Sequence, residues 1–340
     1  MTPRRKAAES LPEGKLDPAR LGRLLELFRT ADPAVVAGPA LGEDAAAIQV
    51  EPGLVVLTTD PITFVSGASA AWLVQVNAND VAAMGARPRY LTVTGLFPAG
   101  STAAGVERVF RELADACRAL GILVVGGHTE VTRAVTRPVL VGQMMGQCPR
   151  DRLRRSADAR PGDAILLAGS AGRVGSAILA RETPAEAVAL LGRKGSRAVA
   201  AWADPPGLSV VEPALALAAI EGVHALHDAT EGGVATAVRE VALASGAGCR
   251  LLVEKIPVAA ETVALCGRFG LDWLGLISSG LLVATAAPEA VDRCLAALER
   301  LGVPAAAAGE ILPAGLWLED AGGRRRELPF FPVDELTRAL

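Results

Sequence analysis

Apolar residues recur along most of the chain in two alternating patterns. Short apolar or alternating runs predict β-strands, and longer segments with apolar residues three or four apart predict helices. In the first half the pattern predicts strands at 45–50, 54–60, 89–97, 122–127 and 137–146, with helices at 70–84 and 103–119. In the second half it predicts strands at 164–170, 224–230, 249–256, 277–286 and 305–312, with helices inside 174–202 and at 210–221, 233–245, 259–269 and 288–301. This alternation is typical of an α/β or α+β sandwich fold.

A charged, irregular segment separates two similar α/β halves. Residues 149–163 read PRDRLRRSADARPGD, and we expect the domain boundary there. The predicted organisation is an N-terminal arm and helix at 1–43, a first domain at 44–150, a second domain at 151–320 and a tail at 321–340. The helix of the arm is predicted at about 16–29, and the tail as a polar hairpin followed by frayed residues.

Composition narrows the class of protein. Of the 340 residues 51% are apolar and 21% charged, so the chain can bury a core. A net charge of −3 argues against a protein that grips nucleic acid through its phosphates. Uncharged stretches are too short for a membrane span and the start lacks the apolar stretch of a secretory signal, so we expect a cytoplasmic protein. The five cysteines are an odd number without a CxxC pair, which indicates reduced core thiols.

Four aspartates lie in predicted turns or at element ends: Asp44, Asp60, Asp80 and Asp228. Mg²⁺ is held by a few carboxylates together with phosphate oxygens, so this set is the composition expected of a nucleotide–metal site. Structural roles are the alternative, because Asp44 and Asp228 also fit caps or turns and Asp60 before proline fits a turn initiator. Asn79 beside Asp80 is more indicative, because polar groups inside an apolar helix need a polar partner when buried.

Glycine-rich turns are the second signal. Predicted turns at 126–130, 232–233 and 278–280 each expose backbone N–H groups at a strand or helix end, the geometry that binds phosphate. A run at 169–175 has the spacing GxxGxxG rather than GxGxxG, and we interpret it as a packing turn. The chain contains no GxxxxGK[ST] motif, which excludes a Walker-type site, and no GxSxG elbow. The three histidines are not spaced as a metal set.

Seven motifs follow one another along the chain: GEDAA at 42–46, TTD at 58–60, NANDVAAMGARP at 77–88, GGHTE at 126–130, PGDAILLAG at 161–169, HDATEGG at 227–233 and SSGLLV at 278–283. Taken in this order, they resemble the signature series of the aminoimidazole-ribonucleotide-synthetase (PurM-like) superfamily. The superfamily includes the synthetase itself, thiamine-monophosphate kinase, selenophosphate synthetase and the HypE-type dehydratases of hydrogenase maturation, all of which use ATP and Mg²⁺. The resemblance is nearest to the HypE-like branch, through GGHTEV and HDATEGG.

The resemblance implies roles for the matching residues. The implied Mg²⁺ ligands are Asp44, Asp60, Asp80 and Asp228, and Asp80 is also implied as catalytic. The implied nucleotide-binding residues are Thr59, Asn79, Gly126, Gly127, His128 and Thr129, the last four in a turn along the triphosphate. Lys15, next to Gly14, is similar to an N-terminal lysine that closes over the phosphates in selenophosphate synthetases, and its alternative is a solvated arm residue.

Two departures from the family bear on the acceptor. HypE-type dehydratases act through a cysteine at the extreme C-terminus, and here no cysteine follows Cys294. Selenophosphate synthetases carry cysteine or selenocysteine in the N-terminal arm, and residues 1–43 contain neither. We therefore expect neither thiocyanate synthesis on the chain's own tail nor selenium chemistry.

The sequence thus predicts a cytoplasmic, Mg²⁺-dependent enzyme that phosphorylates or ATP-activates an oxygen centre of an unidentified small-molecule acceptor, as a phosphotransferase or synthetase. The alternative is a catalytically weak ATP-binding factor that acts with a protein partner in hydrogenase-type metallocofactor assembly. The implied fold has two α/β domains in a homodimer, with the N-terminal sheets forming a barrel between the two copies.

Overall fold

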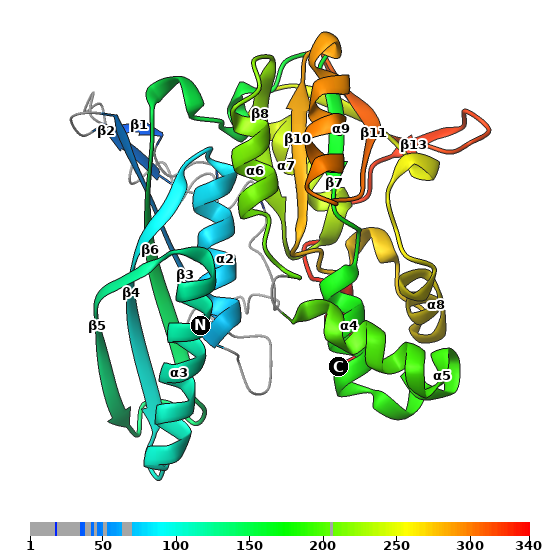
Figure 1. The fold of residues 1–340 in the computed structure, drawn as a ribbon. Helices are drawn as coiled ribbons and strands as arrows, with labels where there is room; N and C mark the ends of the chain where they lie inside the picture. The colour runs from blue at the N-terminus through cyan, green and yellow to red at the C-terminus, as the bar shows by residue number, and fades with distance from the viewer. Residues whose placement is uncertain are drawn as a thin grey trace, which may run out of the picture.

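Two sheets organise the molecule, one in each half of the chain (Figure 1). The structure is a computed structural model that describes residues 18, 35–37, 42–43, 46–49, 53–62, 70–204 and 207–340. Of the helix predicted at 16–29, only residue 18 is among the described residues, so this prediction is not tested.

The first sheet has six strands in the order β1-β2-β3-β6-β4-β5. Their bounds are β1 Val35–Ala37, β2 Ala46–Gln49, β3 Leu54–Ile62, β4 Arg87–Pro98, β5 Leu123–Thr132 and β6 Val139–Cys148. Among the strands described for this sheet, only β4 and β5 pair in parallel, and β5 is the last strand of the order and forms an edge. Helices α2 (Ala70–Ala83) and α3 (Ala103–Leu120) follow β3 and β4 in the chain.

The second sheet has seven strands in the order β13-β12-β9-β11-β7-β10-β8. Their bounds are β7 Ala164–Ala168, β8 Val223–Ala229, β9 Gly248–Leu252, β10 Leu281–Ala286, β11 Ala305–Leu312, β12 Leu316–Glu319 and β13 Arg325–Glu327. The helices of this half are α4 Arg173–Glu182, α5 Pro184–Ala200, α6 Val211–Ala218, α7 Gly233–Ala244, α8 Ala260–Phe269 and α9 Val291–Arg300.

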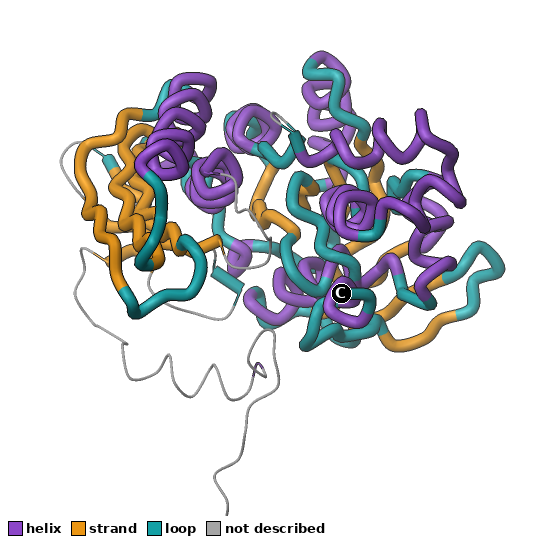
Figure 2. The backbone as a smooth tube through the Cα atoms, turned by 90° about the horizontal axis from the view of Figure 1, so that it is seen from below, coloured by secondary structure: helices purple, strands orange, loops and turns teal. Residues whose placement is uncertain are grey.

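The main core fills the space between the two sheets. Leu73 of α2 and Met144 of β6 belong to the same buried cluster as Leu217 of α6 and Leu226 of β8. Helices therefore lie between the sheets, as Figures 1 and 2 show, while α7 covers the other face of the second sheet. A fully buried leucine contributes about 1.5–3 kcal/mol relative to an exposed one, so this shared core joins the two halves. The predicted α/β fold is confirmed.

The connection between the halves is fixed by one arginine. The Arg154 guanidinium donates to the carbonyl oxygens of Asp151 (2.7 Å), Leu153 (2.9 Å) and Ala218 (2.8 Å). Its backbone N–H donates to the Met84 carbonyl (3.2 Å), just after α2. Strand β6 ends and β7 begins on either side of this connection, and we retain the predicted boundary there as a proposal.

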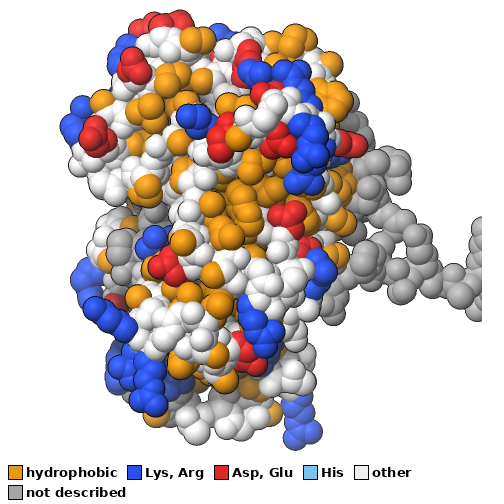
Figure 3. Space-filling view, turned by 90° about the vertical axis from the view of Figure 1, so that its right-hand side faces the viewer, with side chains coloured by type: hydrophobic (Ala, Val, Ile, Leu, Met, Phe, Trp, Pro, Cys, Tyr) orange, Lys and Arg blue, Asp and Glu red, His pale blue; other side chains and the backbone are white. Residues whose placement is uncertain are grey.

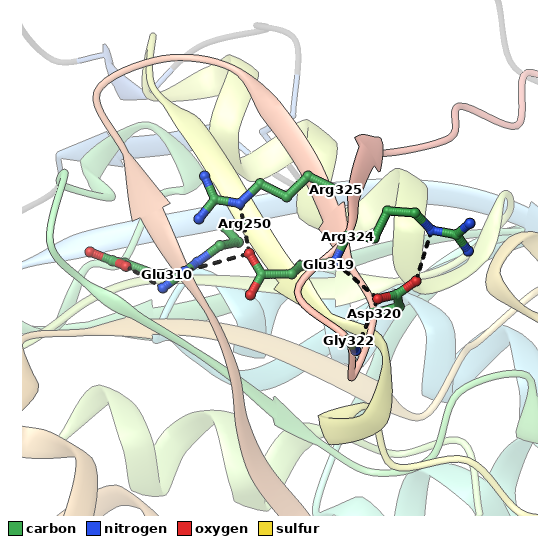
Figure 4. Close-up of polar contacts among 7 residues, drawn as sticks. All are labelled: Arg250, Glu310, Glu319, Asp320, Gly322, Arg324 and Arg325. Atoms are coloured by element: carbon green, nitrogen blue, oxygen red, sulfur yellow. Dashed lines mark hydrogen bonds and ion pairs between the residues drawn. The ribbon is translucent and has the colours of Figure 1, made fainter.

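The C-terminal residues form a charged hairpin and then return to the core. Arg325 of β13 pairs with Glu319 of β12 (2.7 Å), and Arg250 of β9 pairs with Glu310 (3.1 Å), as Figure 4 shows. Beyond the hairpin, Leu328 and Leu336 are buried. The prediction of frayed terminal residues is therefore wrong, because these leucines have apolar surface to cover.

The side of the molecule that carries α5 and α8 is a mixed surface. Figure 3 shows apolar side chains in the middle of this face with charged side chains among and around them. Val188 and Leu190 of α5 and Val263 of α8 are exposed. None of the helices in the described part of the chain combines the length and the apolar character needed to cross a membrane.

Candidate functional site

Helix α2 carries the NAND motif and is buried along nearly its whole length. Asp80 is only 6% exposed, and the Thr58 hydroxyl of β3 donates to its Oδ2 (2.7 Å). This hydrogen bond fixes the position of the Asp80 carboxyl group beside β3. Thr58 is not among the residues that the sequence singled out, and Thr59 was predicted as a nucleotide contact.

Asn77 joins β3 to α2 next to this pair. Its Oδ1 accepts the backbone N–H of Asp60 (3.1 Å), and its Nδ2 donates to the Leu73 carbonyl (2.9 Å). Thr59 is exposed and donates to the Gly142 carbonyl (2.7 Å). Asp60 and Asp80 are thus carried by neighbouring elements with a fixed relative position. Sequence reasoning missed Asn77, although it is the first residue of the recognised motif.

Asn79 has a different role from the one the resemblance implied. Its Nδ2 donates to the Leu208 carbonyl (2.7 Å), and its Oδ1 accepts the backbone N–H of Val210 (2.8 Å). The side chain is fully buried, and both ends of its amide join α2 to the second half. The structure therefore does not bring this side chain to an open nucleotide site.

Asp228 lies at the end of β8, opposite Leu282 of β10. It is buried, and alternation along the strand places it on the same face as Leu226, which packs in the core that includes α2. Strand β8 contacts α2 directly. Asp228 is thus on the side of the second sheet that faces Asp80's helix.

The Gly126–Thr129 segment is not a turn. It lies inside β5, where Gly127 pairs with Val93 after a bulge, and this prediction is wrong. Gly127 has φ +152°, and a Cβ there would lie 2.1 Å from the Val93 carbonyl oxygen. A glycine is therefore needed for β5 to pair with β4 at this position. With α3, the segment lines a cavity of about 230 Å³ that has Phe97 and Leu113 in its walls. His128 is exposed and lies 3.5 Å from Glu130.

The Gly232–Gly233 turn, expected to bind phosphate, already holds an anionic group of the chain. The Gly232 N–H donates to Oδ2 of Asp334 (2.8 Å), and Leu336 N–H donates to Oδ1 (2.8 Å). Burial raises the pKa of Asp334 from 3.8 to about 6, against these backbone hydrogen bonds, which lower it. The turn therefore docks the C-terminal residues, which corrects the expected phosphate cradle.

A complete metal cage is not formed by the described residues, among which no group of three or more His, Cys, Asp or Glu could hold a metal ion. Asp44 and Lys15 lie outside the described residues. Asp60 and Asp80 supply the hard oxygen donors that Mg²⁺ prefers, and Mg²⁺ is usually bound by one or two carboxylates plus substrate phosphates. The donor set therefore fits a Mg²⁺–phosphate site and does not fit a preformed metal cage.

All five cysteines are free and buried. Burial raises the pKa to about 11 for Cys117, Cys148 and Cys294, and to about 12 for Cys249 and Cys266. A nucleophilic cysteine needs a lowered pKa and access to its substrate. These five thiols are therefore core residues, as the sequence predicted.

Comparison with known proteins extends over both halves. Residues 42–148 match the AIR synthase related protein, N-terminal domain, and residues 160–316 match the AIR synthase related protein, C-terminal domain. The chain belongs to the AIR synthase-related family. The resemblance drawn from the seven motifs is confirmed.

The similar curated proteins of this family include carbamoyl dehydratases. The chain is 34% identical over 284 residues to carbamoyl dehydratase HypE of Cupriavidus necator, covering 81% of this chain and 78% of the relative. It is 32% identical over 285 residues to carbamoyl dehydratase HypE of Escherichia coli K12, covering 82% and 81%. The predicted HypE-like branch is confirmed.

Solved structures agree with this placement. The structure superposes on E. coli HypE, a hydrogenase maturation protein, with a TM-score of 0.74 and 27% identity, covering 95% of this chain and 99% of that one. HypE in complex with ATP gives 0.68 and 26%, covering 95% and 96%. A HypE–HypF complex (0.70, 22%, covering 85% and 93%) and an Aquifex aeolicus thiamine monophosphate kinase (0.67, 19%, covering 92% and 100%) share the fold.

Proposed function

We propose that this AIR synthase-related chain is a Mg²⁺-dependent ATP-using enzyme that activates an oxygen centre of a small molecule. The observation that carries the proposal is the match of both halves to carbamoyl dehydratases at 32–34% identity, supported by likeness to HypE bound to ATP. Removing the elements of water from an amide requires its oxygen to become a leaving group, and a phosphate ester makes it one. We propose that this chain makes the oxygen of its acceptor a leaving group in the same way, either by phosphorylating it or by another ATP-dependent activation.

Asp60 and Asp80 would hold the metal, with Asp44 and Asp228 as the further carboxylates of the proposed set. When bound, Mg²⁺ neutralises charge on the phosphate oxygens during transfer. Thr58 holds Asp80 in place, and Asn77 fixes the backbone at Asp60. Lys15, Thr59, Gly126, Gly127, His128 and Thr129 remain the proposed phosphate and nucleotide contacts.

The acceptor is proposed to be a separate molecule. The five thiols of the chain are buried with raised pKa values, so none of them offers a thiolate for group transfer. An oxygen of a small carbonyl or carboxamide compound is then the favoured acceptor class.

The test is ATP consumption by the purified protein with Mg²⁺ against a panel of carboxamides, carboxylates and alcohols. We expect one class to stimulate release of ADP or AMP, and chromatography of the nucleotide product tells the two apart. Asp80→Asn should lower this turnover by at least about tenfold, as expected for loss of a metal ligand. No nucleotide binding by the parent protein with Mg²⁺ would refute the proposal.

We also propose a homodimer formed at β5. Leu123, Val124 and Val131 of this edge strand are 59, 46 and 58% exposed, and an open apolar edge is a site for strand pairing. Sedimentation should give twice the chain mass, and Val124→Asp should give the monomer. A monomeric parent protein at micromolar concentration would rule the dimer out.

A second candidate function is an ATP-binding maturation factor that acts with a protein partner. The absence of a reactive thiol among the five cysteines favours it, and the fold is shared with a HypE that was crystallised with HypF. Tight ATP binding without turnover, together with a protein that copurifies, would favour this candidate over the enzyme.

A further inference from the structure

A buried histidine precedes Asp228 and makes polar contacts with two other elements. His227 Nδ1 lies 3.3 Å from the hydroxyl of Ser156, and its Nε2 lies 3.1 Å from Oε2 of Glu240 on α7. A neutral imidazole protonated on Nε2 satisfies both contacts, donating to Glu240 and accepting from Ser156. His227 and Ser156 are both buried.

This contact fixes the strand from the face opposite to Asp228. Ala225 and Ala229 pack in the cluster that includes α7, whereas Leu226 packs in the cluster that includes α2. Since side chains alternate along a strand, His227 points toward α7 and Asp228 toward α2. The imidazole therefore anchors the backbone immediately before the proposed metal ligand.

The same part of α7 also contacts the first half. Gly42 has φ +78°, and a Cβ there would lie 2.9 Å from the Glu240 carbonyl oxygen and 3.0 Å from the Ala244 Cβ. Gly42 opens the GEDAA motif, two positions before Asp44. Next to Ser156, Arg155 donates to the Val36 carbonyl (3.5 Å) in the strand that precedes this motif. Glu240 thus lies between His227 of β8 and the start of the GEDAA motif.

We propose that His227 and Glu240 are positioning residues that hold Asp228 in place for binding of Mg²⁺–ATP. This inference rests on the proposed function, because it assigns Asp228 to the metal site. Neither residue is proposed to touch the metal or the nucleotide. A purely structural pair would support folding alone, whereas a positioning pair also sets the metal affinity.

The test compares variants for the Mg²⁺ concentration that half-saturates binding of AMPPCP, a non-hydrolysable ATP analogue, measured by calorimetry. His227→Asn cannot reach Glu240, and Glu240→Ala removes the acceptor, so each should raise this midpoint about tenfold. His227→Gln places an amide N–H near the position of Nε2 and should restore the midpoint to within about threefold of the parent value. His224→Asn is the matched control, since His224 contacts Asp163 (2.9 Å) at the other end of β8.

The possible outcomes distinguish failure of the positioning role from failure of the proposed ATP-using function. If the parent binds AMPPCP with Mg²⁺ but folded His227→Asn and Glu240→Ala keep its midpoint, the positioning role is overturned and the proposed function stands. An equal rise in the His224→Asn control would also overturn it, since the effect would then be general destabilisation. If the parent itself does not bind, both proposals fail. Should His227→Asn not fold, Glu240→Ala, whose side chain is partly exposed, decides the test alone.

Discussion

Strands β5 and β8 are both edge strands of their sheets, yet their environments are opposite. Strand β8 is buried almost throughout, because α2 and α6 lie on one face and α7 on the other. Strand β5 is exposed nearly from end to end, including three apolar side chains. An unpaired edge strand exposes backbone N–H and C=O groups that can pair with a strand of another chain. Both faces of β8 are covered by helices of the chain itself, whereas the side chains of β5 are open to solvent.

The polar groups follow the same division. At the end of β8 the chain itself supplies partners, with Glu240 on His227 and Asp334 on Gly232. On β5 the glycines and His128 line an open cavity instead. Apolar residues of β8 should therefore act mainly on stability, and residues on β5 mainly on binding or association.

The largest difference should come from truncating a leucine in each strand. Leu226→Ala in β8 removes a fully buried side chain and should lower the free energy of unfolding by about 2–5 kcal/mol. Leu123→Ala in β5 should change it by less than about 0.5 kcal/mol under conditions where the protein is monomeric. Denaturant unfolding measures both. Equal losses in the two variants would show that Leu123 is as buried in the monomer as Leu226.

Asn79→Ala should be the next most destabilising change. It leaves the Leu208 carbonyl and the Val210 N–H without their partner in a buried position, at a cost of about 2–4 kcal/mol. Thr92→Val is the control, because Thr92 makes an exposed contact with Gln143 beside β5. A variant that loses nucleotide affinity with unchanged unfolding would instead support the nucleotide contact implied by the family.

These residues show where sequence reasoning succeeded. Most strands and helices were predicted within a few residues, because apolar periodicity is a local property, whereas the short strands β1 and β12 were missed. Asn79 was misassigned because its partners lie 129 and 131 positions away. Two adjacent glycines suggested a turn at 126–127, whereas pairing with β4 keeps them in a strand. Contacts between distant segments leave no periodic signal in the sequence.

The docked Asp334 should make part of the stability depend on pH. Its pKa of about 6 in the folded chain lies above the ordinary 3.8, so the protonated form favours folding. This contribution is fully present below about pH 4 and is lost as pH rises to about 6, amounting to about 1–3 kcal/mol. Asp334→Asn should abolish this slope in melting temperature between pH 4 and 6, whatever its absolute stability. Asp320→Asn, at an exposed turn, should leave the slope in place.

The smallest effect on stability is expected for a substitution of His128 on β5. This residue tests whether β5 contributes to nucleotide binding without contributing to stability. The side chain is exposed and its 3.5 Å contact with Glu130 is a surface pair, so His128→Ala should move the melting temperature by no more than about 1–2 °C. If the β5 segment lies along the triphosphate, the same variant loses a hydrogen bond to an anion and should bind ATP with Mg²⁺ about tenfold more weakly. Arg133→Ala, just beyond the strand, is the matched surface control and should bind like the parent. Unchanged ATP binding in both variants would contradict a nucleotide contact at His128. The nucleotide would then be placed nearer to α2 and β3, where Asp80 and Asp60 lie, and dimer formation would remain the proposed role of β5.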